Sequence, residues 1–563
     1  MKRGREDPSP PGVPAKKHRS ASPMLVSRDE IPPHAGPSSQ TPYETVLGPP
    51  ENSRKVLAWG EDPYVVNPEI TLRLLDLYFA HINNGTYCMF PRRAFLRWVQ
   101  NCRVKCQNEL MLLYAVLAMA SVFADDSLSS FGKRCATIAT DAVASKHGRF
   151  SLLMAQTRIL LSLYNFAKGS EGAAWDFCGS ALRALSALRF GKEDGCLDFS
   201  DVPEDARREL SLTKVQLAEC RRRTFWAGFL MDRYNGFCGS TLCFIQPADV
   251  YLRLPCHDTM YDNSQPSNAP FYNNGVVDPT LAILTPSSPV APVAWLCLIS
   301  ALWGDVMTFI YRAIHRAPAG YRDAYEAFHA EMQTAFQGWY SRLPPDLHYS
   351  DANLDRSIQY GYAGTFISMH VLYHFSLMKL NRNVRHALIP EQLPRNIRAA
   401  HYHAHELLRI MCGIAAARRD IVQPIEGQPA RWSFSTPFSG YATLSAIDVV
   451  SGGSPEARLG QTLESIRGGM VCLRELAQYW DSARAQHTAG EKRALQIENV
   501  IQRPNKARNG AWLGRKWGVE GQLEKDFDPE DDCIYGVEYK IYFAALEDDT
   551  GNGSAPAGGL RIA

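Results

Sequence analysis

Apolar residues between positions 67 and 480 recur three or four residues apart, which is helical spacing. Asn67 and Pro68 form a helix start, because asparagine caps the first backbone N–H groups and proline fits the first turn. The apolar side of the helix that follows comprises Leu74, Leu75, Tyr78, Phe79 and Ile82. Strand-like alternation is nearly absent over the same range, so the sequence predicts an all-α fold.

Further helices follow with short links. Residues 110–123 are apolar nearly all round, which is typical of a helix inside a core, and Ser151 is placed to cap another helix. Two more helices have clear apolar repeats, namely Trp175, Cys178, Leu182, Leu185 and Leu188, and Leu463, Ile466, Met470, Leu473, Leu476 and Trp480. Helices are also predicted at residues 295–312, 321–343, 362–381 and 398–418.

Composition divides the chain into three parts. Residues 1–58 are rich in Pro, Ser and charge, lack periodicity and are predicted to be disordered. Residues 59–490 are predicted to form a multi-helical array in two halves, separated by a polar, Pro- and Gly-containing loop at about 257–292. Residues 491–563 are predicted to form a flexible tail, first basic and then acidic and aromatic.

Two basic clusters lie in the first part. They comprise Lys2, Arg3 and Arg5, and Lys16, Lys17 and Arg19. Extended chain between them lets each cluster enter a separate acidic groove of a nuclear import receptor, so the spacing predicts a bipartite nuclear localisation signal. The alternative is a generic basic tail that binds any polyanion.

The tail segment 524–549 carries ten acidic residues against Lys525 and Lys540. Its candidate functional residues are Phe527, Asp531, Asp532, Tyr535, Tyr539, Tyr542 and Phe543. Acids that keep aromatic side chains in solution are typical of an activation segment that folds onto a coactivator. The alternative is a strand or helix that docks on the core, since residues 534–546 are apolar enough to pack.

The composition, 45% hydrophobic and 21% charged, is that of a globular protein. A net charge of +2 gives no overall field that would attract nucleic acid or a membrane. Fourteen scattered cysteines without a secretory signal predict reduced thiols in an intracellular protein. The longest apolar run, residues 110–124, is about five residues too short to cross a bilayer, so no membrane partner is expected.

The most informative stretch is residues 219–255. Its key residues are Glu219, Arg221, Arg222, Arg223, Phe225, Trp226, Asp232, Arg233, Leu254 and Pro255. On a helix the charged and aromatic positions share neighbouring stripes, and charges beside a core are stable only if they are paired or reach water. The arginine run therefore either touches phosphate or forms structural ion pairs with Glu219 or Asp232. We favour the ion pairs and do not interpret the run as a DNA-binding patch.

This stretch resembles the signature of the fungal-specific transcription factor domain, the regulatory middle region of fungal zinc-cluster transcription factors. In that family an arginine run precedes a Phe-Trp pair, an Asp-Arg pair follows about two turns later, and Leu-Pro closes the segment. The resemblance implies a helical regulatory domain in a nuclear protein. Within the signature, residues 239–241 read Gly-Ser-Thr where relatives commonly have Gly-Arg-Pro.

The DNA-binding part of that family is a binuclear zinc cluster of six cysteines within about thirty residues. The first cysteine here is Cys88, and later pairs such as Cys102 with Cys106 and Cys238 with Cys243 are isolated. No zinc or other cofactor is therefore predicted for this chain. The protein acts through a partner, has lost its DNA reader, or belongs to a gene whose first exon is missing from the sequence.

Histidines show some ligand-like spacing. His370 and His374 are four residues apart, and residues 401, 403 and 405 are alternating histidines. His405 and Glu406 begin a metalloprotease-like motif, but Arg409 stands where its second histidine belongs. We expect these histidines at the edge of the core or on the surface. The sequence also lacks a phosphate-binding loop, a dinucleotide fingerprint and a nucleophile elbow, so no enzyme is predicted.

The resulting prediction is a nuclear regulator of RNA polymerase II transcription. The resemblance implies pathway-specific control of a metabolic or secondary-metabolite gene cluster in a fungus. Expected partners are promoter DNA, bound directly or through a zinc-cluster partner, a nuclear import receptor and a coactivator. A small-molecule effector and a dimer remain open. The alternatives are a coregulator that pairs with a zinc-cluster factor without binding DNA, and a helical enzyme.

Overall fold

The computed structural model describes residues 61–146, 148–199, 209–235, 243–273, 276–277, 290–314, 317–421, 434–452 and 458–502. The chain divides into two units, Met1–Val56 and Leu57–Ala563, and every described residue lies in the second. The predicted import signal at residues 2–19 and the predicted activation segment at residues 524–549 lie outside the described residues.

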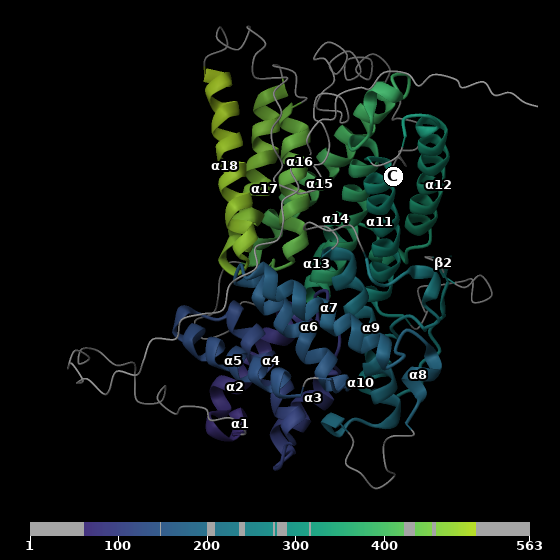
Figure 1. Cartoon of the computed structure of the whole chain (residues 1–563). Helices are drawn as coiled ribbons and strands as arrows, with labels where there is room; N and C mark the ends of the chain where they lie inside the picture. The colour runs from purple at the N-terminus through teal and green to yellow at the C-terminus, as the bar shows by residue number, and fades with distance from the viewer. Residues whose placement is uncertain are drawn as a thin grey trace, which may run out of the picture. The chain divides into compact units, whose positions relative to one another are not determined.

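Helices dominate the described chain (Figure 1). The first ten are α1 (Pro63–Val66), α2 (Pro68–Tyr78), α3 (Arg92–Asn101), α4 (Gln107–Ala120), α5 (Ser129–Ser145), α6 (Leu152–Ala167), α7 (Glu171–Ala187), α8 (Glu193–Leu197), α9 (Lys214–Asn235) and α10 (Asp258–Asp262). The others are α11 (Pro292–Ile314), α12 (Tyr321–Ser341), α13 (Asp351–Gln359), α14 (Ala363–Arg382), α15 (Leu393–Ile421), α16 (Pro437–Gly452), α17 (Leu459–Tyr479) and α18 (Asp481–Gln502).

Shorter elements connect these helices. They are the π-turn η2 (Phe79–Asn83) and the 3₁₀ turns η3 (Ser121–Phe123), η4 (Asp126–Leu128), η5 (Glu209–Ser211), η6 (Pro247–Asp249), η8 (Pro345–Leu347) and η9 (His386–Leu388). Two strands of two residues each, β1 (Tyr272–Asn273) and β2 (Val276–Val277), pair antiparallel. The predicted all-α class is confirmed.

Two predicted helix starts are found in place. The Asn67 side chain accepts a hydrogen bond from the backbone N–H of Ile70, with Pro68 as the first residue of α2. The Ser151 hydroxyl accepts one from the N–H of Met154 at the start of α6. Each cap satisfies a backbone donor that the first helical turn leaves without a partner.

The predicted core helices are buried. In α4 every residue from Leu110 to Ala120 is buried, where the helix packs against α2, α5 and α6. One prediction is wrong. Trp175 was expected on the apolar side of α7 but is 47% exposed, whereas Cys178, Leu182 and Leu185 are buried. Trp175 lies one turn before Cys178, next to the exposed first residues of α7, where no other described helix covers it.

The helices after residue 290 pack side by side. α14 lies between α11 and α15, α15 also contacts α16 and α17, and α17 packs along α18 (Figure 1). Helix α11 is long and apolar enough to cross a membrane by length and composition, but 83% of its most apolar window is buried inside the protein. It also contacts α9, and one continuous hydrophobic cluster runs from Leu74 to Ile497. The two predicted halves therefore share a core.

Two predicted boundaries differ in the structure. The segment 257–292, expected to be a loop, contains α10 and the strand pair, and Tyr261 and Tyr272 within it are buried. Its aromatic side chains pack on α9, which the polar composition concealed. Helix α18 continues to Gln502, past residue 490 where the tail was expected to begin, because Arg493 and Ile497 are buried on its inner side.

Candidate functional site

Helix α9 carries the arginine run, and all three arginines are buried. The guanidinium of Arg222 donates to both carboxylate oxygens of Glu193, with the shortest distance 2.5 Å, and to Glu219 at 3.0 Å. Burial alone would lower the pKa of Arg222. Hydrogen bonds and the negative charges of Glu193 and Glu219 outweigh this effect and raise the pKa above its ordinary value, so the side chain stays charged.

Arg223 is held by three different elements. It donates from Nε to Glu219 at 3.1 Å, from Nη1 to Asp258 of α10 at 2.7 Å, and from Nη2 to the carbonyl of Cys256 at 2.6 Å. Its guanidinium also lies 4.6 Å from the centre of the Tyr261 ring. Burial would lower the pKa of Arg223, but the carboxylates of Asp258 and Glu219 raise it well above its ordinary value.

The guanidinium of Arg221 is contacted by backbone carbonyls and aromatic rings. Its Nη1 donates to the carbonyl of Asp198 at 2.5 Å and to that of Cys196 at 3.3 Å. Its guanidinium lies 4.7 Å from the centre of the Phe199 ring and 5.6 Å from that of Phe190. Arg221 thus fastens the segment after α8 to α9.

The other end of α9 anchors the segment at residues 243–245. The two carboxylate oxygens of Asp232 accept from the backbone N–H groups of Phe244 and Ile245, both at 2.9 Å. Arg233 donates to the carbonyl of Ile245 at 2.8 Å. Burial raises the pKa of Asp232, and the two N–H bonds oppose this rise. The sequence offered an arginine as the partner of Asp232, whereas the structure gives it backbone amides.

The aromatic residues of the signature also connect α9 to the segments that follow it. Trp226 donates its indole N–H to the carbonyl of Arg253 at 2.8 Å, two residues before Pro255. Its ring meets those of Phe225, Phe229 and Tyr272 edge to face, with centroids 5.3 to 5.6 Å apart. These contacts bind α9 to the extended segment that ends the signature.

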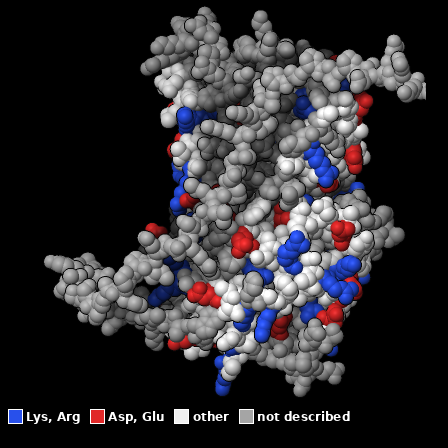
Figure 2. Space-filling model, viewed as in Figure 1, with Lys and Arg blue, Asp and Glu red and all other residues white. Residues whose placement is uncertain are grey.

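The structure thus confirms the predicted pairing of arginines with Glu219. The three arginines are engaged inside the protein and do not present a phosphate-binding face. On the face shown in Figure 2, basic and acidic side chains are interspersed over the described surface. The sequence could not show that the carboxylates of Glu193 and Asp258 complete the network, because they lie 29 and 35 residues from their arginine partners.

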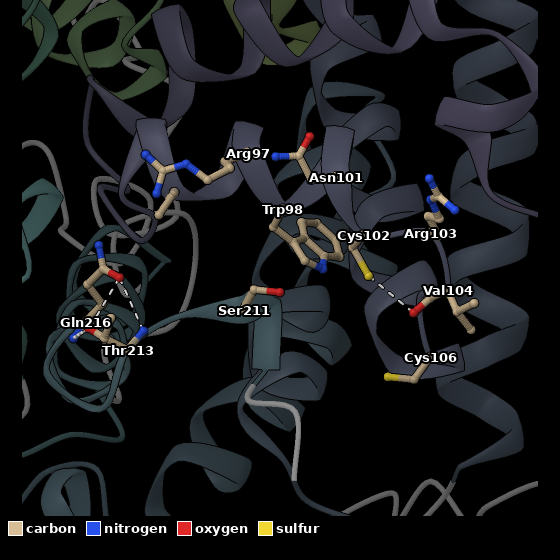
Figure 3. A pocket seen from close by; sticks show the side chains of 11 residues that line it. Arg97, Trp98, Asn101, Cys102, Arg103, Val104, Cys106, Ser211, Thr213 and Gln216 are labelled. Carbon is tan, nitrogen blue, oxygen red and sulfur yellow. Dashed lines mark hydrogen bonds between the residues drawn. The ribbon is translucent and has the colours of Figure 1, made fainter. Parts of the chain in front are cut away.

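A pocket of about 860 Å³ opens beside the start of α9 (Figure 3). Four positions of α3 line one wall at helical spacing, namely Ala94, Arg97, Trp98 and Asn101. The loop after α3 supplies Cys102, Arg103, Val104 and Cys106, and the opposite wall comprises Ser211, Thr213 and Gln216. In Figure 3 Ser211 faces Trp98, with Thr213 and Gln216 on one side and Val104 and Cys106 on the other.

Two buried charged residues fix the walls of this pocket. The carboxylate of Glu109 accepts from the N–H of Cys106 at 2.9 Å and from the N–H of Leu210 at 3.1 Å, so it joins the loop to η5. Lys105 donates to Asp62 at 2.5 Å and to the carbonyls of Val99 and Cys102. These contacts fix the loop and η5 from the side away from the pocket.

His370 and His374 of α14 are buried, so the prediction that they lie at the edge of the core or on the surface is wrong, whereas the histidines of α15 are half-buried. His374 and His403 approach each other with their Nδ1 atoms 3.0 Å apart, and His370 bonds the carbonyl of Leu347 at 2.9 Å. Burial lowers the pKa of His370 and His403 to about 3. Across the described part of the chain, no group of three or more His, Cys, Asp or Glu side chains is placed to hold a metal ion.

Residues 75–300, which include α9 and the pocket, match the fungal specific transcription factor domain. The match covers the segment in which the arginine network, the Phe-Trp pair and the closing Leu-Pro were described. Helices α12 to α18 follow the matched residues in the chain.

Several proteins whose names describe them as regulators of transcription are similar to the chain. An uncharacterised transcriptional regulatory protein of Schizosaccharomyces pombe is 26% identical over 56% of this chain and 32% of its own length. A Zn(2)-C6 fungal-type transcription factor of Fusarium oxysporum f. sp. lycopersici is 22% identical over 79% of this chain and 49% of its own length. A pigment biosynthesis transcriptional activator of Monascus ruber is 22% identical over 39% of this chain and 40% of its own length.

The chain thus spans between about a third and a half of the length of these relatives. No solved structure matches it. The relatives and the domain are described as regulators of transcription, which favours a regulator over an enzyme.

Proposed function

We propose that the chain is a nuclear regulator of RNA polymerase II transcription in a fungus, with pathway-specific control of a metabolic or secondary-metabolite gene cluster. The observation that carries the proposal is the match of residues 75–300 to the fungal specific transcription factor domain. The pigment biosynthesis activator among the relatives supports the assignment to biosynthetic genes. The chain reaches promoter DNA directly or through a zinc-cluster partner.

The contacts of α9 support a regulatory role for the helical body. Its arginines are engaged with Glu193, Glu219 and Asp258 inside the protein, so this part of the domain holds a fold together and does not read DNA. Nuclear import through the basic clusters at residues 2–19 belongs to the same proposal. So does activation through the tail segment 524–549, which would bind a coactivator.

Chromatin occupancy of the tagged full chain in its native host tests the proposal. Promoter peaks over a contiguous set of biosynthetic genes, with loss of their transcripts on deletion, are the expected result. A variant with Lys16→Ala and Lys17→Ala is the matched control, because it should lose the peaks by failing to enter the nucleus. An expressed, intact and nuclear protein without promoter peaks would sink the proposal.

A coregulator without DNA contact is the second candidate. It is favoured by the isolated cysteine pairs of the sequence and by the internal position of the α9 arginines. It predicts that the purified chain is not retained on naked DNA at about 50 mM salt, where basic DNA readers bind tightly. Retention that weakens steeply with added salt would instead assign DNA binding to this chain.

A further inference from the structure

We propose that the pocket between α3, the loop 102–106 and the start of α9 binds a small organic anion with an apolar body, such as a medium-chain or aromatic carboxylic acid. The inference concerns binding to the purified protein and stands whether or not the regulatory function proposed above is correct. Three observations on the described residues carry it: an indole N–H, the charge of the lining, and the size and walls of the pocket.

The indole N–H of Trp98 is the first observation. Trp98 is 2% exposed, and its Nε1 atom has no hydrogen-bond partner in the structure. In Figure 3 this nitrogen is turned toward the space bounded by Ser211, Cys102 and Cys106. An indole nitrogen can only donate, and a buried donor without an acceptor is unfavourable. The site is therefore prepared for a ligand that brings an acceptor oxygen.

The charge of the lining is the second observation. Arg97 and Arg103 line the pocket and are exposed, and none of its lining residues is an aspartate or a glutamate. Two acids in the walls already have partners, since Glu109 accepts from backbone N–H groups and Asp62 pairs with Lys105. The guanidinium groups favour a carboxylate, which they bind with two parallel hydrogen bonds.

The size and walls of the pocket are the third observation. A volume of about 860 Å³ lies within the range of sites for small molecules. The pocket has apolar surface from Ala94, Trp98, Val104 and the sulfur atoms of Cys102 and Cys106. Val104 is 79% exposed, so an apolar ligand could cover it. Lys105 and Glu109 fix the walls before a ligand binds, which lowers the entropic cost of binding.

The expected pose follows from these contacts. The carboxylate pairs with Arg97 or Arg103, which lie on opposite sides of Trp98 in Figure 3, an acceptor oxygen reaches the Trp98 N–H, and the apolar body covers Val104 and the cysteines. Ser211 adds a hydroxyl on the opposite wall, on a backbone with the left-handed φ of 55° that the N–H bond of Leu210 to Glu109 helps to hold. No covalent step is involved.

Fluorescence titration of the full chain with 1-anilinonaphthalene-8-sulfonate, an apolar aromatic anion, is the first part of the test. Trp98→Phe removes the indole N–H and should weaken the affinity about fivefold, the effect of one net hydrogen bond. Trp339→Phe is the matched control, because that buried indole N–H donates to the carbonyl of Trp295, far from the pocket lining. The combined Arg97→Gln and Arg103→Gln variant should weaken the affinity about tenfold or more, since charged hydrogen bonds are lost.

Displacement of the probe is the second part of the test. Decanoate should displace it at lower concentration than the neutral decanol, and an Arg356→Gln variant, which changes an exposed arginine of α13, should bind like the unchanged chain. Equal displacement by decanol, or unchanged probe affinity in the double arginine variant, would overturn the proposal. If circular dichroism shows that Trp98→Phe does not fold, the probe affinity of the double arginine variant still tests the proposal, because both arginines are exposed.

Discussion

Two regions of the molecule bury basic side chains and treat them in opposite ways. Helix α9 buries Arg222 and Arg223 as charged groups, because Glu193, Glu219 and Asp258 surround them. Helix α14 buries His370 and His374 as neutral groups, because the rings that contact them, from Phe, Tyr, Trp and His side chains, carry no negative charge. Guanidinium cannot give up its proton within a protein, whereas imidazole can.

The difference explains what each region requires. A buried cation is tolerated only with a carboxylate and further hydrogen bonds, so the arginine network ties together segments that are far apart in sequence. A buried neutral imidazole needs only to lose its proton, at a cost that depends on pH. The α9 network should therefore respond to removal of a carboxylate, and the α14–α15 histidines to acid.

Glu219→Ala is expected to have the largest effect. Glu219 is 2% exposed and accepts from Arg222, Arg223 and the N–H of Cys256, so its removal leaves two buried guanidinium groups short of an anion. We expect a loss of about 3–5 kcal/mol in the free energy of unfolding, measured by urea denaturation.

The matched control for this experiment is Asp481→Ala. Asp481 pairs with Arg484 through side chains that are 50% and 64% exposed, and such pairs contribute about 0–1 kcal/mol. Equal losses in the two variants would show that the α9 network does not carry the stability assigned to it.

Acid is expected to have the next largest effect, through the α14–α15 histidines. Burial lowers the pKa of His370 and His403 to about 3, and desolvation lowers that of His374 well below its ordinary value. Between about pH 6.5 and pH 3 the unfolded chain binds these protons and the folded chain does not. Stability is therefore fully present above pH 6.5 and is lost as the pH falls, by at least about 1 kcal/mol per pH unit.

His403→Gln locates this effect. Glutamine retains a hydrogen-bonding group opposite His374 but does not titrate, so the slope of the unfolding free energy against pH should fall by about one proton. The same substitution at His257, an exposed histidine before α10, is the control for the replacement of histidine by glutamine itself. A slope that His403→Gln does not alter would place the acid sensitivity elsewhere.

Asp232→Ala is expected to have an intermediate effect confined to one segment. The carboxylate bonds the N–H groups of Phe244 and Ile245, and its loss leaves these donors unsatisfied at a cost of about 1–3 kcal/mol. Hydrogen exchange should accelerate at those two amides before it changes in α4. Unchanged exchange at both amides would mean that other contacts hold this segment.

Sequence reasoning recovered the helical class, the caps at Asn67 and Ser151 and the pairing of the arginine run with Glu219, because all depend on residues within one helix or turn. It missed Glu193 and Asp258, whose contribution depends on how distant segments meet. It also missed the pocket, whose opposite walls come from α3 and from the start of α9. Trp175 was misplaced because periodicity identifies a helical side but not the point where the core ends.

The smallest effect on stability is expected at the pocket. Its arginines are exposed, unlike the buried arginines of α9 and the buried histidines of α14. Arg97 and Arg103 are exposed, so the free energy of unfolding of Arg97→Gln and Arg103→Gln should stay within about 0.5 kcal/mol of the unchanged chain. Arg222→Gln, the same substitution on α9, should lose several times more, because it strands Glu193 and Glu219. Urea denaturation of the three variants side by side decides the point. A large loss of stability in either variant would show that Arg97 or Arg103 helps to hold the fold together. If both variants are as stable as the unchanged chain, ligand binding is the remaining reason for two cations at the mouth of an apolar pocket.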